Sequence, residues 1–323
     1  MKKLMLGNEA AARGIYEAGC ALISSYPGTP STEITERAAQ YDEIYCEWAP
    51  NEKVAMEVAF GAALAGKRSA CVMKHVGLNV AADPLFTIAY TGVNAGMVIC
   101  VADDPGMHSS QNEQDSRHYA VSAKIPMLEP ADSAETRDFA KRAFELSEEY
   151  DTPVFLKLCT RISHSQSILE LGQRVEPARR PYEKDIAKYV MVPGNARPRH
   201  PIVEERTRRL TAFAETTDLN REEMGEDASI GIITSSTSYQ YAREVFGPKA
   251  SILKLGLVNP LPKQKILDFA AKVDKVLVLE ELDPVIEDHC RALGLDVLGK
   301  DVLPLEGEFS QGLVAEKLGK PGK

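Results

Sequence analysis

Residues 20–31 read CALISSYPGTPS, an apolar run that ends in a turn with two prolines and a glycine. The run has the composition of a buried strand, and the helix-like stretch STEITERAAQ follows the turn. In a parallel sheet, ligands bind beyond the carboxyl ends of the strands, where such a turn lies. Thr29 and Ser31 would offer hydroxyl groups there, beside the free N–H groups of the helix start. A capped turn with Ser31 as N-cap and no ligand accounts for the same spacing, so the turn alone predicts a fold and no function.

The same strand-and-helix unit repeats through the first 160 residues. Further apolar runs are IYCEW (44–48), SACVM (69–73), GMVICVAD (96–103) and TPVFLKL (152–158). Helix-like stretches lie between them, with Asn8, Ser31, Asn51 and Ser133 at the expected N-cap positions. Continuous runs of Val, Ile and Ala suit strands that are covered on both faces. We therefore predict an α/β domain at 1–160, with a parallel sheet and helices on both faces.

A second, smaller α/β block is predicted at 228–312. SIGIITSS (229–236), SILKLGLV (251–258) and KVLVLEEL (275–282) have the pattern of strands, and helix-like stretches separate them. Residues 161–227 between the blocks are rich in proline and arginine, which is typical of disorder, although YVMVP and a long helical pattern after Pro201 favour an ordered connector. Residues 313–323 are expected to be a polar tail without a core of its own.

Two more polar loops follow strands at the same expected edge of the first sheet. Glu52 opens the helix after IYCEW, where a carboxylate is usually a solvated partner of the helix dipole, worth roughly 0.3–1 kcal/mol. The helix behind it, VAMEVAFGAALAG, is small and apolar on most sides, which favours burial of Glu52. The loop at 74–79 contributes His75, Gly77 and Asn79, although a lone histidine is more often a hydrogen-bonded structural residue than a ligand or base. Together the three loops predict a cleft.

The fourth loop on this edge, at 102–118, is the longest and reads ADDPGMHSSQNEQDSRH. Its acids and histidines lack a regular ligand spacing, so we predict no metal site here. A polar loop of this length is usually functional or mobile. We interpret it as a substrate-facing loop, with His108 and Arg117 as candidate substrate-binding residues.

The composition excludes several classes of protein. The 323 residues are 44% hydrophobic and 26% charged, with no apolar stretch near the roughly 18 residues of a membrane helix. The N-terminal residues lack the apolar core of a signal peptide, so we expect a cytoplasmic chain. A net charge of −9 argues against nucleic acid or an anionic membrane as the main partner. The six cysteines form no C-x-x-C motif, which excludes an iron–sulfur cluster or structural zinc site in this sequence.

At these motifs the chain resembles a known family. YPGTPSTE, NEKVAMEVAFGAALAGKRS, MKHVGLNVAADPL and VADDPGMHSSQNEQDSRHYA are similar to the alpha subunits of indolepyruvate:ferredoxin oxidoreductases. The likeness is dense through about residue 165 and weaker to about residue 310. More distantly, YPGTPS resembles the Y-P-x-T-P-S turn of other 2-oxoacid:ferredoxin oxidoreductases.

The resemblance implies an activity, a cofactor and partners. Enzymes of this family convert a 2-oxoacid, coenzyme A and oxidised ferredoxin into acyl-CoA, carbon dioxide and reduced ferredoxin, a step of amino-acid catabolism. They use thiamine diphosphate (TPP) with Mg²⁺, and [4Fe–4S] clusters. Residues 1–160 would be the TPP pyrimidine-binding domain, and 228–312 would resemble the transketolase C-terminal domain, a scaffold for oligomer contacts.

The resemblance also implies roles for individual residues. Glu52 falls on the glutamate that hydrogen-bonds N1′ of the TPP pyrimidine, and Thr29 falls on the threonine near the substrate carboxylate. A proton shared between the glutamate and N1′ lets N4′ of the pyrimidine remove the thiazolium C2 proton. We also expect the pyrimidine to be held by the 74–79 loop, through His75, Gly77 and Asn79.

The sequence departs from the pattern of the whole enzyme. The G-D-G…N motif that holds the diphosphate through Mg²⁺ is missing, as are cluster-binding cysteine motifs. We therefore expect the N-terminal part of an alpha subunit, either shortened or the product of a split gene, and inactive alone. Its expected partners are the diphosphate-binding and iron–sulfur part, a beta (gamma-type) subunit, ferredoxin and coenzyme A. Two alternatives stay open: the pyrimidine-domain subunit of a non-oxidative TPP-dependent decarboxylase, and an assembly module without catalysis.

Overall fold

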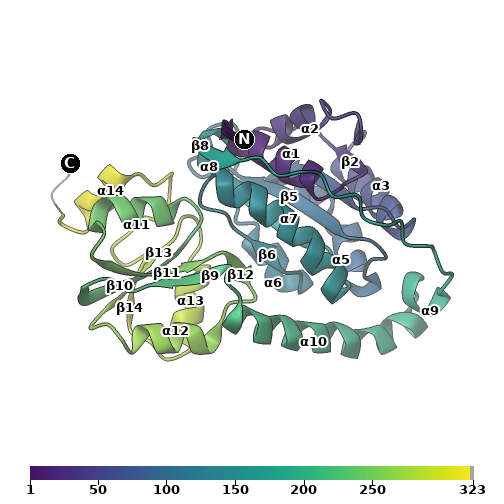
Figure 1. Cartoon of the computed structure of the whole chain (residues 1–323). Helices are drawn as coiled ribbons and strands as arrows, with labels where there is room; N and C mark the ends of the chain where they lie inside the picture. The colour runs from purple at the N-terminus through teal and green to yellow at the C-terminus, as the bar shows by residue number, and fades with distance from the viewer. Residues whose placement is uncertain (321–323) are drawn as a thin grey trace.

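The protein consists of two sheets covered by helices, together with a short two-stranded ribbon (Figure 1). The computed structural model describes residues 1–320. The larger sheet has the spatial order β12 (Leu257–Asn259), β6 (Met127–Leu128), β7 (Val154–Cys159), β5 (Met97–Asp103), β4 (Ser69–Lys74), β2 (Leu22–Ser25) and β3 (Tyr45–Trp48). Its neighbouring strands run parallel, except that β12 is antiparallel to β6. The five apolar runs of the first 160 residues are all strands of this sheet, as predicted.

Helices cover both faces of the larger sheet, as predicted. The helices of its part of the chain are α1 (Gly7–Glu17), α2 (Thr32–Ala38), α3 (Glu52–Leu64), α4 (His75–Val80), α5 (Ala82–Thr91), α6 (Arg117–Ala123), α7 (Ser133–Tyr150) and α8 (Thr160–His164). Along β5, Ile99 and Val101 belong to the apolar cluster that contains α3 and α5, whereas Val98 and Cys100 belong to the cluster of α1 and α7. This alternation explains why the strand is apolar at every position.

Of the four predicted N-caps, one is confirmed in full. Asn51 begins α3, and its side chain accepts a hydrogen bond from the N–H of Val54. Ser31 is the N-cap residue of α2, but its hydroxyl donates to a carbonyl instead. Asn8 lies inside α1. Ser133 is the first residue of α7, where Asp132 is the cap, because a carboxylate accepts the N–H groups of a helix start more strongly than a hydroxyl.

The smaller sheet has the order β14 (Val297–Leu298), β13 (Val276–Leu279), β10 (Asp227–Ser235), β11 (Ala250–Leu255) and β9 (Asn220–Glu223). The helices of this block are α11 (Ser238–Phe246), α12 (Lys263–Ala270), α13 (Val285–Ala292) and α14 (Gln311–Lys317). The run 251–258, predicted as one strand, is divided at Gly256 into β11 and β12. A side chain at Gly256 would lie 2.5 Å from the carbonyl oxygen of Leu219. After this break β12 leaves its own block and pairs with β6 of the larger sheet.

The proline- and arginine-rich segment between the blocks is ordered. It contains β8 (Gln166–Glu170), which pairs with β1 (Lys2–Leu6), then α9 (Ile186–Tyr189) and α10 (Pro193–Thr216). Figure 1 shows α10 running along one side of the molecule from the larger block to the smaller one. Two of its buried arginines, Arg199 and Arg206, donate to carbonyl groups at the end of α5, including that of Ala89. Arg199 and Arg206 therefore close the C-terminal end of α5.

The structure differs from the polar tail expected at residues 313–323. Residues 311–317 form α14, in which Val314 and Ala315 are buried and Val314 belongs to the core of the smaller block. Residues 321–323 of the expected tail lie outside the described residues. None of the helices among residues 1–320 combines the length and apolar character that crossing a bilayer requires.

Candidate functional site

The four polar loops predicted on one edge of the larger sheet lie there together. Their strands run parallel, and Ser25 of β2 pairs with both Trp48 of β3 and Val72 of β4, so the strands end at the same edge. Side chains join the loops that follow: Lys74 packs against Gly28 and donates to the carbonyl oxygen of Ser109 at 2.9 Å. The prediction that these loops meet is confirmed.

Glu52 is buried at the first position of α3, with 8% of its surface exposed. The Asn51 cap fixes the start of this helix, and small apolar residues behind Glu52 pack α3 onto the sheet. Within residues 1–320, no hydrogen bond or ion pair reaches the Glu52 carboxylate. Neither oxygen of this carboxylate is among the fully buried polar atoms without a partner, so in a largely buried residue the carboxylate itself meets solvent and is open to a ligand.

Gly77 lies directly against this carboxylate. A Cβ atom at position 77 would come within 2.3 Å of Glu52 Oε1 and 2.6 Å of Glu52 Cγ. Only a residue without a side chain allows α4 to approach the start of α3 this closely. The structure therefore brings together two of the predicted cofactor-binding residues, and it gives a physical reason for glycine at this position.

His75 is also buried beside them, with 1% of its surface exposed. Its Nε2 atom lies 3.2 Å from the carbonyl oxygen of Asn112, and because a carbonyl only accepts, Nε2 carries a proton. Nδ1 is buried and has no partner within the described residues, so a neutral ring presents an unused acceptor. Asn79, by contrast, is exposed, and its Oδ1 accepts a hydrogen bond from the hydroxyl of Tyr119 at 2.6 Å.

Thr29 and His108 line one cleft of about 410 Å³ next to this cluster. Its other lining residues come from the ends of β5 and β7 and from the smaller block, and they include Asp104, Thr160, Arg161, His164 and Glu308. Arg161 forms a forked ion pair with Glu308, with distances of 2.9 and 2.6 Å. The cleft thus combines hydroxyl groups, two acids and basic side chains, of which Arg161 and His108 are paired with Glu308.

Sequence reasoning missed Arg161 because the run TPVFLKL identifies a strand but gives no sign that the residue two positions beyond Cys159 faces the cleft. The general rule that ligands bind beyond strand ends was the signal that could have found it, since Arg161 follows β7 as Thr29 follows β2.

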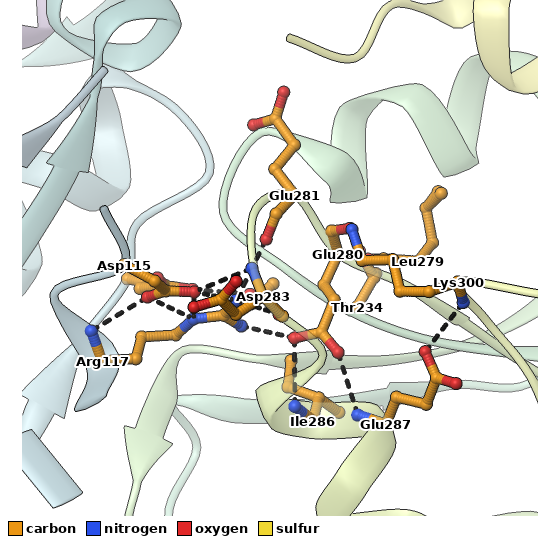
Figure 2. Close-up of polar contacts among 12 residues, drawn as sticks. Asp115, Arg117, Thr234, Leu279, Glu280, Glu281, Asp283, Ile286, Glu287 and Lys300 are labelled. Atoms are coloured by element: carbon orange, nitrogen blue, oxygen red, sulfur yellow. Dashed lines mark hydrogen bonds and ion pairs between the residues drawn. The ribbon is translucent and has the colours of Figure 1, made fainter. Parts of the chain in front are cut away.

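Arg117 does not lie in the cleft, which corrects the expectation that it binds substrate. It is buried between the two blocks, with 2% of its surface exposed (Figure 2). Its guanidinium contacts Asp115 at 2.6 Å and Glu280 at 2.5 Å, and it donates to the carbonyl oxygens of Glu281 and Asp283. These bonds occupy the guanidinium, so none of it faces a substrate in this structure.

The charge of Arg117 controls the ionisation of Asp115. Burial alone would raise the pKa of the Asp115 carboxyl, but the adjacent guanidinium lowers it to about 2. The carboxylates of Asp115 and Asp283 and the ring of His118 lie close enough to hold a cation. Arg117 already supplies the positive charge to Asp115, so this group is explained without a metal.

A second buried charge cluster lies beneath the long loop. Lys157 on β7 contacts Glu129 at 2.6 Å and Asp103 at 3.4 Å. Burial opposes the charge on Lys157, but the two carboxylates, Glu129 first, raise the pKa of the ammonium group above its usual value. Ser235 of the smaller block donates to Glu129 at 2.5 Å, so this cluster also joins the blocks.

Comparisons with known proteins identify relatives of this chain. A relative from Archaeoglobus fulgidus, indolepyruvate oxidoreductase subunit IorA, is 42% identical over 334 residues, which cover 99% of this chain and 54% of the relative. The chain spans about half the length of the curated relatives that it matches in this way.

Two solved structures have the same fold. The 2-oxoglutarate:ferredoxin oxidoreductase from Magnetococcus marinus, solved with 2-oxoglutarate, coenzyme A and succinyl-CoA bound, has a TM-score of 0.82 at 18% identity, over 98% of this chain and 65% of its own. A split-gene transketolase, described as an inactive beta4 tetramer, has a TM-score of 0.58 at 16% identity, over 97% and 93%. At these identities the likeness concerns the fold alone, and it confirms the predicted fold class.

The family itself is shown by a match in sequence that covers about two thirds of the chain. The pattern described as "Pyruvate flavodoxin/ferredoxin oxidoreductase, thiamine diP-bdg" matches residues 13–228, which include Thr29, Glu52, Gly77 and the whole 102–118 loop. The chain therefore belongs to the thiamine diphosphate-binding family of pyruvate flavodoxin/ferredoxin oxidoreductases.

Proposed function

We propose that this chain is the part of a 2-oxoacid:ferredoxin oxidoreductase that holds the pyrimidine ring of TPP, with an aryl pyruvate of the indolepyruvate type as substrate. The whole enzyme would form acyl-CoA, carbon dioxide and reduced ferredoxin. The names of relatives at about 42% identity support this substrate class. In this proposal residues 1–160 are the pyrimidine-binding domain, 161–227 the connector and 228–312 the transketolase C-terminal-like domain.

The observation that carries the proposal is Glu52, a largely buried residue whose carboxylate is bound by no group of residues 1–320. When bound, TPP supplies a carbon nucleophile that adds to the carbonyl of a 2-oxoacid and accepts the electron pair released with carbon dioxide. Glu52 would hydrogen-bond the ring nitrogen N1′ of the pyrimidine and hold a proton there. The unused Nδ1 acceptor of His75 and the bare backbone at Gly77 also fit a flat ring that carries an amino group.

The cleft of Thr29 would receive the carboxylate of the substrate. The Thr29 hydroxyl, His108 and Arg161 line it. His108 and Arg161 are paired with Glu308 in this structure and would exchange that partner for the substrate. His164 adds a further basic side chain. These groups bind and orient an anion, whereas Glu52 handles a proton, so the two neighbouring clusters have separate tasks.

The remaining parts of the enzyme would come from outside this sequence. It has no G-D-G motif to hold Mg²⁺ at the diphosphate and no cluster-binding cysteine motif. We propose that a diphosphate-binding and [4Fe–4S]-carrying part, a beta (gamma-type) subunit, ferredoxin and coenzyme A complete a cytoplasmic oligomer acting in amino-acid catabolism. The chain alone should then bind TPP weakly.

Reconstitution tests the proposal. The chain is combined with the diphosphate-binding part and the beta subunit, and ferredoxin reduction is followed with indolepyruvate, phenylpyruvate, pyruvate or 2-oxoglutarate. We expect reduction that depends on TPP and coenzyme A and is fastest with the aryl pyruvates. Release of an aldehyde without ferredoxin reduction would instead assign a non-oxidative decarboxylase. Tight, Mg²⁺-dependent binding of TPP by the chain alone, measured by calorimetry, would contradict the division of the site.

A further inference from the structure

The long loop at 102–118 contains three basic residues, and each is paired with an acid of the smaller block. His108 contacts Glu308 at 3.2 Å, Arg117 contacts Glu280 at 2.5 Å, and His118 contacts Asp283 at 2.8 Å. The loop begins at the end of β5 in the larger sheet, so all three pairs cross from one block to the other. Since every basic residue of the loop has an acid partner in the smaller block, we infer that this block holds the loop in place.

In the Arg117–Glu280 pair, here called the central pair, the smaller block holds the carboxylate in a fixed orientation. Glu280 follows β13, and its two carboxylate oxygens accept the N–H groups of Ile286 and Glu287 at 3.0 and 2.9 Å, in the first turn of α13 (Figure 2). The Lys300 ammonium group donates to the Glu280 carbonyl oxygen at 2.8 Å. Arg117 therefore docks on a carboxylate that is already oriented by a helix start.

The other two pairs, here called the outer pairs, contain exposed histidines: His108 lies near the middle of the loop, and His118 follows Arg117 at its end. His118 and Asp283 are more than half exposed, so this pair is screened by solvent. Glu308 is less exposed, because Arg161 also holds it in a forked ion pair. The backbone N–H of Glu308 lies close to Gly106, which places the loop directly against the smaller block.

The other side of the same loop touches the proposed cofactor site. The Ser109 carbonyl accepts from Lys74, and the Asn112 carbonyl accepts from His75. His75 lies in the same short helix as Gly77, which contacts Glu52. A continuous set of contacts thus leads from Glu280 through the loop to the residues around Glu52.

We propose that the smaller block acts as a clamp that positions the 102–118 loop over the substrate cleft, with Arg117 as its central positioning residue. This role in catalysis rests on the proposed function, whereas the clamp itself is a property of this chain alone. In the complete enzyme, release of the clamp should weaken binding of the 2-oxoacid more than it slows the chemical step, because the clamped residues bind and orient and do not exchange protons.

Amide hydrogen exchange on the chain without ligands tests the clamp. In Glu280→Gln the amide has one accepting oxygen, so the bonds to Arg117 and the two N–H groups of α13 cannot all form. We expect amides in 105–114 to exchange roughly ten- to a hundredfold faster, as for the loss of one charge-assisted hydrogen bond. Glu222→Gln is the matched control, since Glu222 pairs with Lys272 inside the smaller block at 2.7 Å.

A second variant protects the test against misfolding. Asp283→Asn with Glu308→Gln leaves the Arg117–Glu280 pair in place and weakens the outer pairs, together with the Arg161–Glu308 pair. It should also speed exchange at 105–114, while amides in β11 and β13 keep wild-type protection. If Glu280→Gln does not fold, exchange in this double variant tests whether the smaller block holds the loop. Wild-type exchange at 105–114 in every folded variant of this set would overturn the clamp.

Kinetics of the reconstituted enzyme separate positioning from general stability. Glu280→Gln should raise KM for the 2-oxoacid about tenfold and change kcat less than about threefold, because ground-state binding is lost. An unchanged KM with faster loop exchange would remove the catalytic role of the clamp and leave the proposed function intact. Loss of all activity in the wild-type assembly would count against the proposed function and not against the clamp.

Discussion

Replacement of Glu52 by glutamine separates the proposed proton-handling role from a structural one. The two side chains are nearly equal in size, so the close contact with Gly77 survives. No residue within 1–320 pairs with the carboxylate, so the substitution breaks no internal hydrogen bond. The only stabilising effect that it removes is the favourable placement of a negative charge at the start of α3, worth about 0.3–1 kcal/mol.

The effect on catalysis should be much larger than this effect on folding. Glutamine still hydrogen-bonds a ring nitrogen but cannot exchange a proton with it. Loss of a positioned acid–base group lowers the rate by at least about 10²-fold, which corresponds to about 2.7 kcal/mol of barrier. TPP affinity should fall only modestly, because most of the cofactor would be held elsewhere.

Two measurements on the reconstituted enzyme check this. Exchange of the TPP C2 proton, followed by NMR, and 2-oxoacid-dependent ferredoxin reduction should fall together in Glu52→Gln. Glu57→Gln is the control, since Glu57 lies exposed on the same helix and should leave both rates unchanged. Wild-type rates in Glu52→Gln would refute the reasoning and reduce Glu52 to a helix-dipole partner.

Three further predictions concern the site and the junction of the blocks. Gly77→Ala places a methyl group 2.3 Å from the carboxylate of α3, so reconstituted activity should fall at least about tenfold while calorimetry shows an intact fold. Burial raises the pKa of the Glu281 carboxyl from its usual 4.5 to about 7, so the folded chain binds this proton more tightly than the unfolded chain. Stability should therefore fall by up to about 3 kcal/mol as the pH rises between these values, and Glu281→Gln should flatten this slope in urea titrations at about pH 5 and pH 8. Lys157→Met leaves Glu129 and Asp103 buried without their cation and should cost about 3–5 kcal/mol of unfolding free energy; a loss below 1 kcal/mol would show that the two acids are neutral in the fold.

Much of the larger sheet could be predicted from the sequence because its strands are buried on both faces. A continuously apolar run such as GMVICVAD is typical of a strand that is covered on both faces. Turns such as YPGTPS show where each strand ends. Because parallel strands bring their ends to one edge of the sheet, the sequence alone could predict that Glu52 and the 74–79 loop lie close together. The resemblance to a known family added the roles of Glu52 and Thr29.

The positions of Arg117 and β12 could not be predicted in this way. Arg117 lies in a polar loop, where the sequence gives no measure of burial, and its partner Glu280 is more than 160 residues away. The run 251–258 has the composition of a single strand, and only the close approach of Leu219 at Gly256 explains the break. Residues 313–317 looked polar as a segment, although Val314 and Ala315 are buried in the fold. Each of these outcomes depends on contacts between residues distant in sequence.

The exchange of β12 into the larger sheet has a consequence for the order of folding. Until residues 257–259 are available, β6 has a partner only on the side of β7, and its other edge is open. The pairing closes a loop of roughly 130 residues, and contacts of such high sequence separation form slowly. On the ribosome, the first domain would therefore emerge with an unpaired strand edge, which is prone to associate with other chains. It becomes complete only when a strand from the second block, made later, closes that edge.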